Sequence, residues 1–109
     1  MTYKQIASMV SSIGLPYAYY QFPDGTAQEP PFVVFFYANT DDVYADDTNY
    51  QRITTLNIEL YTSEKDFETE KTVEEILKNN NLTYYKEENY IDSEQMWQIA
   101  YEMEVMINE

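Results

Sequence analysis

Residues 95–108 alternate between apolar and polar side chains with the period of a β-strand. One side carries Trp97, Ile99, Tyr101, Met103, Val105 and Ile107, and the other carries Gln98, Ala100, Glu102, Glu104 and Asn108. Since successive side chains of a strand point to opposite faces, this pattern predicts a strand with one face in a core. At a rise of about 3.4 Å per residue it would be about 45 Å long, more than twice the usual length. We therefore expect this strand to bend, or to run past its own domain and meet a neighbouring molecule.

Two segments have the spacing of amphipathic helices. The first, residues 3–13, follows Thr2 as a candidate cap and ends before a glycine and a proline. The second begins at Ser63, which forms a capping-box pattern with Asp66, and ends at the asparagines 79–81. The predicted inward stripes are Ile6, Met9, Val10 and Ile13 in the first helix, and Phe67, Val73, Ile76 and Leu77 in the second.

Four more segments are predicted as strands because they are rich in aromatic, β-branched or alternating residues. They are residues 17–22, 32–38, 50–62 and 82–86. A polar loop is expected over residues 39–49, and a turn region over residues 87–94. The resulting order, α-β-β-β-α-β-β, predicts an α+β fold: a mainly antiparallel sheet with the helices packed on one face. Residues 1–109 then form a single domain.

The composition excludes most catalytic chemistry. The chain has no cysteine and no histidine, which removes disulfides, Ser–His and Cys–His nucleophiles, and zinc sites of thiolate or imidazole. Six lysines and arginines face 20 acidic residues, a net charge of −14, which disfavours nucleic acid or an acidic bilayer as the main ligand. Neither a signal peptide nor a membrane span is visible. We expect a folded protein that is not an enzyme and has no cofactor.

A short acidic segment follows the aromatic run. Asp41, Asp42, Asp46 and Asp47 lie within seven residues, a density that invites a calcium interpretation. The spacing differs from an EF-hand, because the segment has no glycine and Arg52 occupies the position of the last ligand. We expect no metal here, and a solvated loop or a contact surface instead.

The run FVVFFY, residues 32–37, has two interpretations. As a central strand covered on both faces it needs no further function. If the helices cover only one face, then Phe35, Tyr37 or their alternates form an exposed apolar patch, and such patches mark interfaces. Met96 and Met106, on the polar side of the last strand, favour the second interpretation.

Several ordered blocks carry a resemblance to a known family. They are LPYAYYQF, PPFVVFFY, VYADDTNY, IELYTSEKDFETEKTVEEIL and SEQMWQIAYEMEV. Together they resemble the small tail-terminator, or tail-completion, proteins of long-tailed phages and prophages of Gram-positive bacteria. The resemblance covers the chain from about Tyr3 to Val105 and rests on the order and spacing of blocks.

The resemblance implies a structural role in the virion, with assembly in the host cytoplasm. Such subunits form a ring, commonly of six, on the head-proximal end of the tail tube, where they stop polymerisation and join the head. The implied partners are other copies, the major tail tube protein and the head–tail connector proteins, while DNA passes through without specific binding. We expect Asp41, Asp42, Asp46 and Asp47 to line the bore, since negative walls repel phosphates.

Three other roles remain open. One is another neck protein, of the head-completion or connector type, and the second is a tail-tube protein. The third belongs to a different class: an acidic inhibitor that mimics DNA, whose size and charge this chain matches.

Overall fold

The computed structural model describes residues 1–26, 28–45 and 49–108, with the backbone alone for 39–45 and 49–51. The elements are α1 (Tyr3–Ser11), β1 (Tyr17–Tyr19), β2 (Phe32–Ala45), β3 (Asn49–Thr62), α2 (Phe67–Asn79), β4 (Tyr85–Ile91) and β5 (Met96–Ile107). They form a five-stranded sheet in the order β1-β2-β3-β5-β4. β1 runs parallel to β2, and every other neighbouring pair is antiparallel. The predicted α+β class and element order are confirmed.

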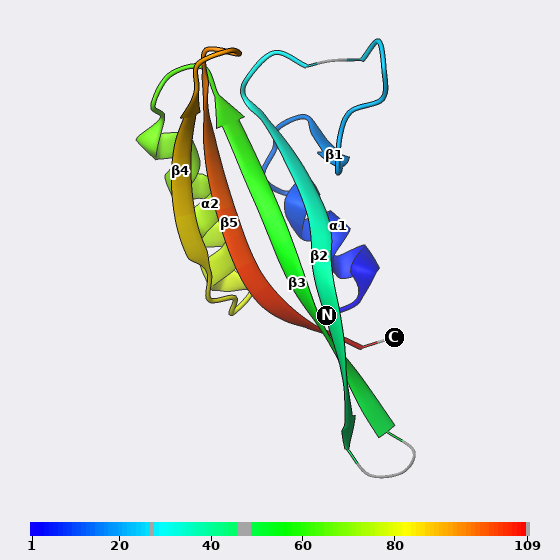
Figure 1. The fold of residues 1–109 in the computed structure, drawn as a ribbon. Helices are drawn as coiled ribbons and strands as arrows, with labels where there is room; N and C mark the ends of the chain where they lie inside the picture. The colour runs from blue at the N-terminus through cyan, green and yellow to red at the C-terminus, as the bar shows by residue number, and fades with distance from the viewer. Residues whose placement is uncertain (27, 46–48, 109) are drawn as a thin grey trace.

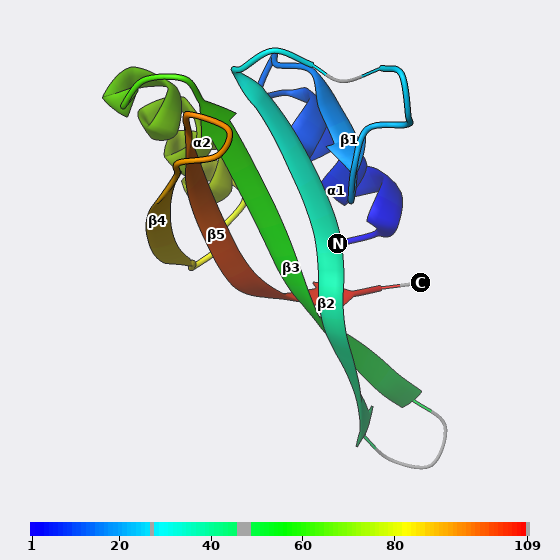
Figure 2. The ribbon, with the colours of Figure 1, turned by 45° about the horizontal axis from the view of Figure 1, so that its top comes forward.

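Both helices cover the same face of the sheet, α1 behind β1 and β2, and α2 behind β4 and β5 (Figures 1 and 2). The core lies between this face and the helices. It consists of Ile6, Met9 and Val10 of α1, Ile13 just after that helix, Val73 and Leu77 of α2, Val33 and Phe35 of β2, Leu56, Ile58 and Leu60 of β3, and Ile99, Tyr101, Met103, Val105 and Ile107 of β5. The apolar alternates of β5 and the apolar stripe of α1 therefore face the core.

The two helices begin with different caps. In α1, the Thr2 hydroxyl accepts from the Gln5 amide at 3.1 Å, and the Gln5 side chain accepts from the Thr2 amide at 2.8 Å, which completes a capping box. The expected start of α2 at Ser63 is wrong, because Asp66 is the cap and accepts from the Thr69 amide.

The later start of α2 also corrects its predicted inward stripe. Phe67 is the first residue of the helix and is 71% exposed, with the ammonium group of Lys65 4.9 Å from its ring centre. The position three residues further along is inward instead, and there Glu70 is buried. The predicted inward positions of Val73 and Leu77 are confirmed. Phe67 is not inward, because the helix begins only at this residue and its ring stays outside the core.

Three strand boundaries differ from the sequence-based expectation. The strand predicted over 17–22 ends at Tyr19. The predicted loop over 39–49 is mostly strand, because β2 continues to Ala45 and pairs with β3 up to Asn49. The predicted turn over 87–94 contains most of β4, and the turn proper follows Ile91. β4 is an edge strand with one neighbour, β5, and its backbone pairs with that strand. Its side chains are nearly all exposed, so its sequence shows no alternation between core and solvent.

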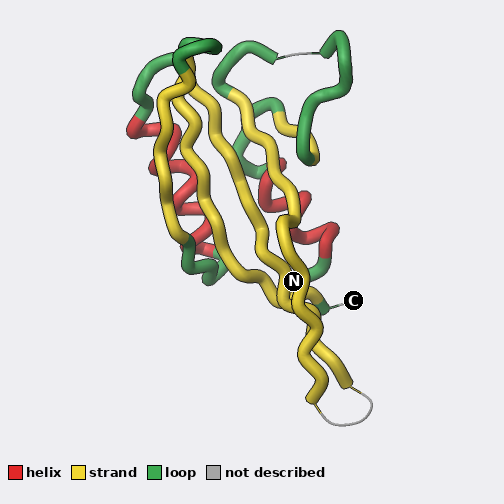
Figure 3. Tube along the Cα trace, in the orientation of Figure 1, coloured by secondary structure: helices red, strands yellow, loops and turns green. Residues whose placement is uncertain are grey.

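The hairpin of β2 and β3 projects beyond the rest of the sheet. β5 pairs with β3 only as far as Ile107 opposite Arg52, whereas β2 and β3 stay paired to Ala45 and Asn49. The strand pairs beyond Arg52, residues 43–45 and 49–51, form a two-stranded ribbon that we call the arm (Figure 3). A bulge at Ala38, between the pairs of Tyr37 and Asn39, precedes it. The molecule is accordingly elongated, 51 × 29 × 23 Å.

Among the described residues, neither helix is long and apolar enough to cross a membrane.

Candidate interaction surface

The sheet face opposite the helices, here called the open face, is the main candidate surface. Residues paired across neighbouring strands share a face, so the strand registers define its members. Those with described side chains are Phe32, Val34 and Phe36 of β2, Ile53, Thr55, Asn57, Glu59 and Tyr61 of β3, Met96, Gln98, Ala100, Glu102, Glu104 and Met106 of β5, and Tyr85, Glu87, Asn89 and Ile91 of β4. This face has an apolar end, an acidic middle and an apolar residue, Met106, near the arm.

The apolar end is hollowed. A loop that follows β1 borders the ends of β2, β3, β4 and β5, and between them lies an open hollow of about 460 Å³. We call this space the aromatic hollow. It is lined by Tyr20, Gln21, Phe22, Pro23, Asp24, Gly25, Gln28, Phe32, Val34, Tyr61, Ile91, Glu94 and Met96.

Aromatic rings hold the floor and one wall of the hollow together. Phe22 packs edge-on against Phe32 with ring centres 5.4 Å apart, and Phe32 stacks on Tyr61 at 4.9 Å. Val34, next to Phe32 on the same face, is only 6% exposed. Contacts of this kind bury apolar area and fix ring orientation, so the hollow is a preformed feature of the subunit.

Tyr61 links the hollow to the acidic middle of the face. Its hydroxyl donates to Glu59 at 2.9 Å and accepts from the Gln98 side chain at 2.9 Å. Burial, opposed by the Gln98 hydrogen bond and aided by Glu59, raises the pKa of Tyr61 to about 12. The phenol is therefore neutral at physiological pH and serves as a donor that orients the Glu59 carboxylate.

The acidic middle consists of Glu59, Glu87, Glu102 and Glu104 on three adjacent strands. No lysine or arginine of the described chain lies on this face. Arg52 pairs with the buried Ile107 on the helix side, and Lys86 lies on that side of β4. The other lysines are Lys4 in α1, Lys65 before α2, and Lys71 and Lys78 in α2. The open face thus carries charge of one sign.

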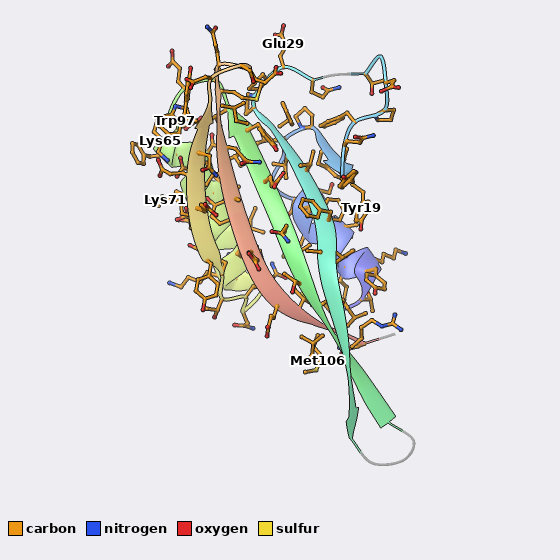
Figure 4. All side chains as sticks on the ribbon, viewed as in Figure 1. Tyr19, Glu29, Lys65, Lys71, Trp97 and Met106 are labelled. Atoms are coloured by element: carbon orange, nitrogen blue, oxygen red, sulfur yellow. The ribbon has the colours of Figure 1, made fainter. Side chains whose placement is uncertain are left out.

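The predicted interface residues divide between the two faces. Phe35 is 7% exposed and belongs to the core, so its expected place on an open face is wrong. Tyr37 packs on the same helix side, with its ring centre 5.1 Å from that of Tyr3. Met96 and Met106 do lie on the open face, Met96 in the aromatic hollow and Met106, 42% exposed, near the base of the arm (Figure 4).

The predicted acidic loop is only partly described. Asp41 and Asp42 lie in β2, paired along the backbone with Ile53 and Arg52, rather than in a loop. Asp46 and Asp47 lie outside the described residues. Among the described residues, no group of three or more acidic side chains is arranged to hold a metal ion.

A second charged cluster, on the helix side, joins α2 to β4. Glu70, 1% exposed, receives Lys65 at 2.6 Å on one carboxylate oxygen and Lys86 at 2.8 Å on the other. The Lys86 contact is an ion pair without good hydrogen-bond geometry. Lys65 also reaches Glu88, and Lys86 also reaches Glu74. Burial acts to lower the pKa of both lysines, but the carboxylates outweigh it and the pKa of each is raised.

The hydroxyl of Tyr101, inside the core, completes this cluster by donating to Glu74 at 2.8 Å. Burial acts to raise the pKa of Glu74, but the bonds from Lys86 and Tyr101 hold it below its usual range. These carboxylates are all matched by lysines or a hydroxyl, so the cluster fastens the helix to the sheet. Glu74 also borders an open hollow of about 670 Å³ beside α2, together with Lys71, Glu75 and Lys78 of the same helix.

The sequence-based prediction missed most of the aromatic hollow. Phe22, Phe32 and Tyr61 are far apart in the chain and meet only through the strand register. One signal was present: Tyr61 is an aromatic residue that follows the polar Thr55, Asn57 and Glu59 on one side of β3.

No protein family model and no curated protein sequence matches the chain. Among chains of solved structures, 19 match. One comes from a structure described as "Virion of native gene transfer agent (GTA) particle", with a TM-score of 0.61 and 15% identity over 98% of this chain and 91% of that chain. At this identity the similarity shows a shared fold. The protein therefore has the fold of a chain of that virion particle.

Proposed function

We propose that the protein is a structural subunit of a phage-like virion that forms a ring, of six copies, on the head-proximal end of the tail tube. There it ends tube polymerisation and contacts the tube protein on one side and the head–tail connector on the other. The observation that carries this proposal is the fold shared with a chain of the gene transfer agent virion over nearly the whole length. The sequence blocks that resemble tail-terminator proteins supply the more specific assignment.

The shape of the subunit supports an assembling role. The arm extends past β5, and β1 covers β2 only at Val33, Val34 and Phe35. The rest of the β2 edge and the whole outer edge of β4 have no neighbouring strand in the described chain. Two different edges and a projecting arm suit a contact in which one patch meets a different patch on the next copy, and such contacts close into rings.

The acidic charge has a place in this role. In the proposed ring, the part of β2 next to the arm faces the bore. This part contains Asp41 and Asp42, and Asp46 and Asp47 face the bore with them. Negative walls keep DNA from binding as it passes. A ring in which these aspartates lie on the outer rim contradicts this part of the proposal.

The test is electron microscopy of tails assembled in a phage or prophage from which this gene has been deleted. We expect over-long tubes without heads, restored to normal length when the gene is supplied in trans. Loss of a connector would instead give tubes of normal length without heads, and loss of the tube protein would give no tubes. Heads joined to tails of normal length in the deletion strain contradict the proposal.

A second candidate is the acidic inhibitor that mimics DNA, favoured by the single sign of charge on the open face. Glu102 and Glu104 are alternate residues of β5, about 7 Å apart along the strand, on the same face. An inhibitor binds a DNA-binding protein and is displaced by DNA, whereas a tail subunit binds tail tubes. Parallel pull-downs with purified DNA-binding proteins and with purified tubes distinguish the two.

A further inference from the structure

We propose that the aromatic hollow is a docking site for a basic segment of a different protein, which inserts one aromatic or large aliphatic side chain between flanking lysines or arginines. The site is defined by the subunit itself, so its test and the test of the virion role give separate results.

The hollow has the form of a receptor for a side chain. Its volume of about 460 Å³ falls within the usual range of ligand pockets. Phe22, Phe32, Tyr61 and Met96 present apolar surface, and all four side chains are only partly exposed. Part of this apolar surface remains open to solvent on a face that no described helix covers, and covering it is favourable.

The acidic residues at the rim of the hollow determine which charge a partner should carry. Asp24 and Glu94 line the hollow and are exposed. Tyr61, which also lines the hollow, donates a hydrogen bond to the Glu59 carboxylate and so orients that carboxylate beside the hollow. Beyond them the open face continues into Glu87, Glu102 and Glu104, with no described basic residue. An inserted side chain therefore brings its neighbours against carboxylates, and cations are the complementary neighbours.

A second copy of this chain does not match that requirement. Of its six basic residues, Lys65 and Lys86 are held by carboxylates within the subunit. Arg52 has its own interaction within the subunit. Lys4, Lys71 and Lys78 remain, on helices of a molecule whose net charge is −14. A contact of the open face with another copy would bring its carboxylates close to a molecule of the same net sign, at a cost in free energy.

The experiment uses the full chain and three short synthetic peptides of equal length. The first has a central tryptophan flanked on both sides by lysine and arginine, the second has alanine in place of the tryptophan, and the third has glutamates in place of the basic residues. Binding is followed by two-dimensional NMR of the ¹⁵N-labelled protein. We expect the first peptide to shift amides around the hollow, and to bind roughly tenfold more tightly than either control peptide.

Two variants with the same charge change locate the site. Met96→Lys places an ammonium group in the hollow, whereas Tyr85→Lys places one at an 84% exposed position of the same face, outside the hollow. We expect Met96→Lys to weaken binding of the first peptide roughly tenfold and Tyr85→Lys to change it less than about twofold. The NMR spectrum of each variant reports whether it is folded, and Glu94→Gln, at the exposed rim, should weaken binding and lessen its dependence on salt.

Three results would overturn the proposal. They are equal binding of the alanine peptide, which would mean attraction by charge alone, equal weakening by both lysine variants, and shifts that map away from the hollow. Self-association of the protein through the same amides, seen as shifts that depend on protein concentration, would identify a second copy as the occupant instead.

Discussion

Glu70 is a buried carboxylate whose role follows from its two lysines. It occupies an inward position of α2 at which the helix period calls for an apolar residue, and Lys65 and Lys86 reach it from the preceding loop and from β4. Removing one partner of a buried ionic cluster leaves charge without compensation, which is costly even when the intact cluster adds little net stability.

Glu70→Gln should therefore lower the free energy of unfolding by about 2 kcal/mol, less than a fully isolated pair because each lysine keeps a second carboxylate. Urea denaturation followed by circular dichroism measures the change. Glu75→Gln, on the exposed side of the same helix, should alter stability by less than about 0.5 kcal/mol. Equal effects of the two substitutions would contradict the assigned role.

The Asp66 cap predicts a pH dependence. Its two oxygens accept from the Thr69 hydroxyl at 2.6 Å and the Thr69 amide at 3.1 Å, and these bonds hold the pKa of the carboxyl below its usual range. A pKa that is lower in the folded state contributes stability above the unfolded value of about 3.9, and this stability is lost as the pH falls through the folded value.

Asp66→Asn should keep the cap, since asparagine caps helices about as well as aspartate, but should remove this titration. We expect similar stability at neutral pH and a smaller loss than in the unmodified protein between about pH 5 and pH 2. Urea denaturation across this range measures both curves. Parallel curves would show that the cap carboxylate contributes nothing to the acid sensitivity.

At the scale of elements, periodicity predicted those segments whose neighbours impose a core face. The alternation of β5 and the stripe of α1 were right because each buries one side in the core between the sheet and the helices. The extension of β2 through residues 39–45 was missed because Asn39, Asp41 and Asp42 have weak strand propensity, and the pairing of this segment is supplied by β3. β4 was predicted too early in the sequence for a related reason. As an edge strand it pairs with β5 alone, so it does not need the apolar alternation that would mark its position.

The candidate site was predicted in part, for a similar reason. Met96 and Met106 were placed on the correct face because the alternation of β5 fixes it. In the run FVVFFY nearly every residue is apolar, so the sequence contains no indication of which alternates face the helices. Pairing of Phe35 with Ile58, and packing of Tyr19 on Phe35 at 5.3 Å, decide it.

The arm should be separable from the fold. Its pairs lie beyond the end of β5, and an isolated two-stranded ribbon is marginally stable at best. Replacing residues 43–51 by an Asn-Gly turn should change the free energy of unfolding by less than about 1 kcal/mol. If the proposed ring forms, the shortened protein should fail to cosediment with tail tubes that bind the full chain, and retained binding would exclude the arm from the contact.

At the scale of the whole molecule, net charge sets the conditions for assembly. Each chain carries −14, and a ring of six brings six such charges together. Salt at physiological strength shortens the range of this repulsion to about 8 Å. Ring formation should therefore strengthen as sodium chloride is raised from about 0.01 to 0.15 M, measured by light scattering at constant protein concentration. Dissociation on addition of salt would show that attractive ion pairs dominate the contact.

The bulge at Ala38 has a consequence for how related proteins can diverge. Tyr37 pairs with Leu56 and Asn39 with Thr55, so Ala38 is an extra residue in an otherwise regular ladder. Its deletion would leave every later pair as it is, while removing the bend and added twist that a bulge gives a strand. Gain or loss of one codon is thus enough to re-aim the hairpin tip, which lets a lineage adjust its fit to a new neighbour without rebuilding the sheet.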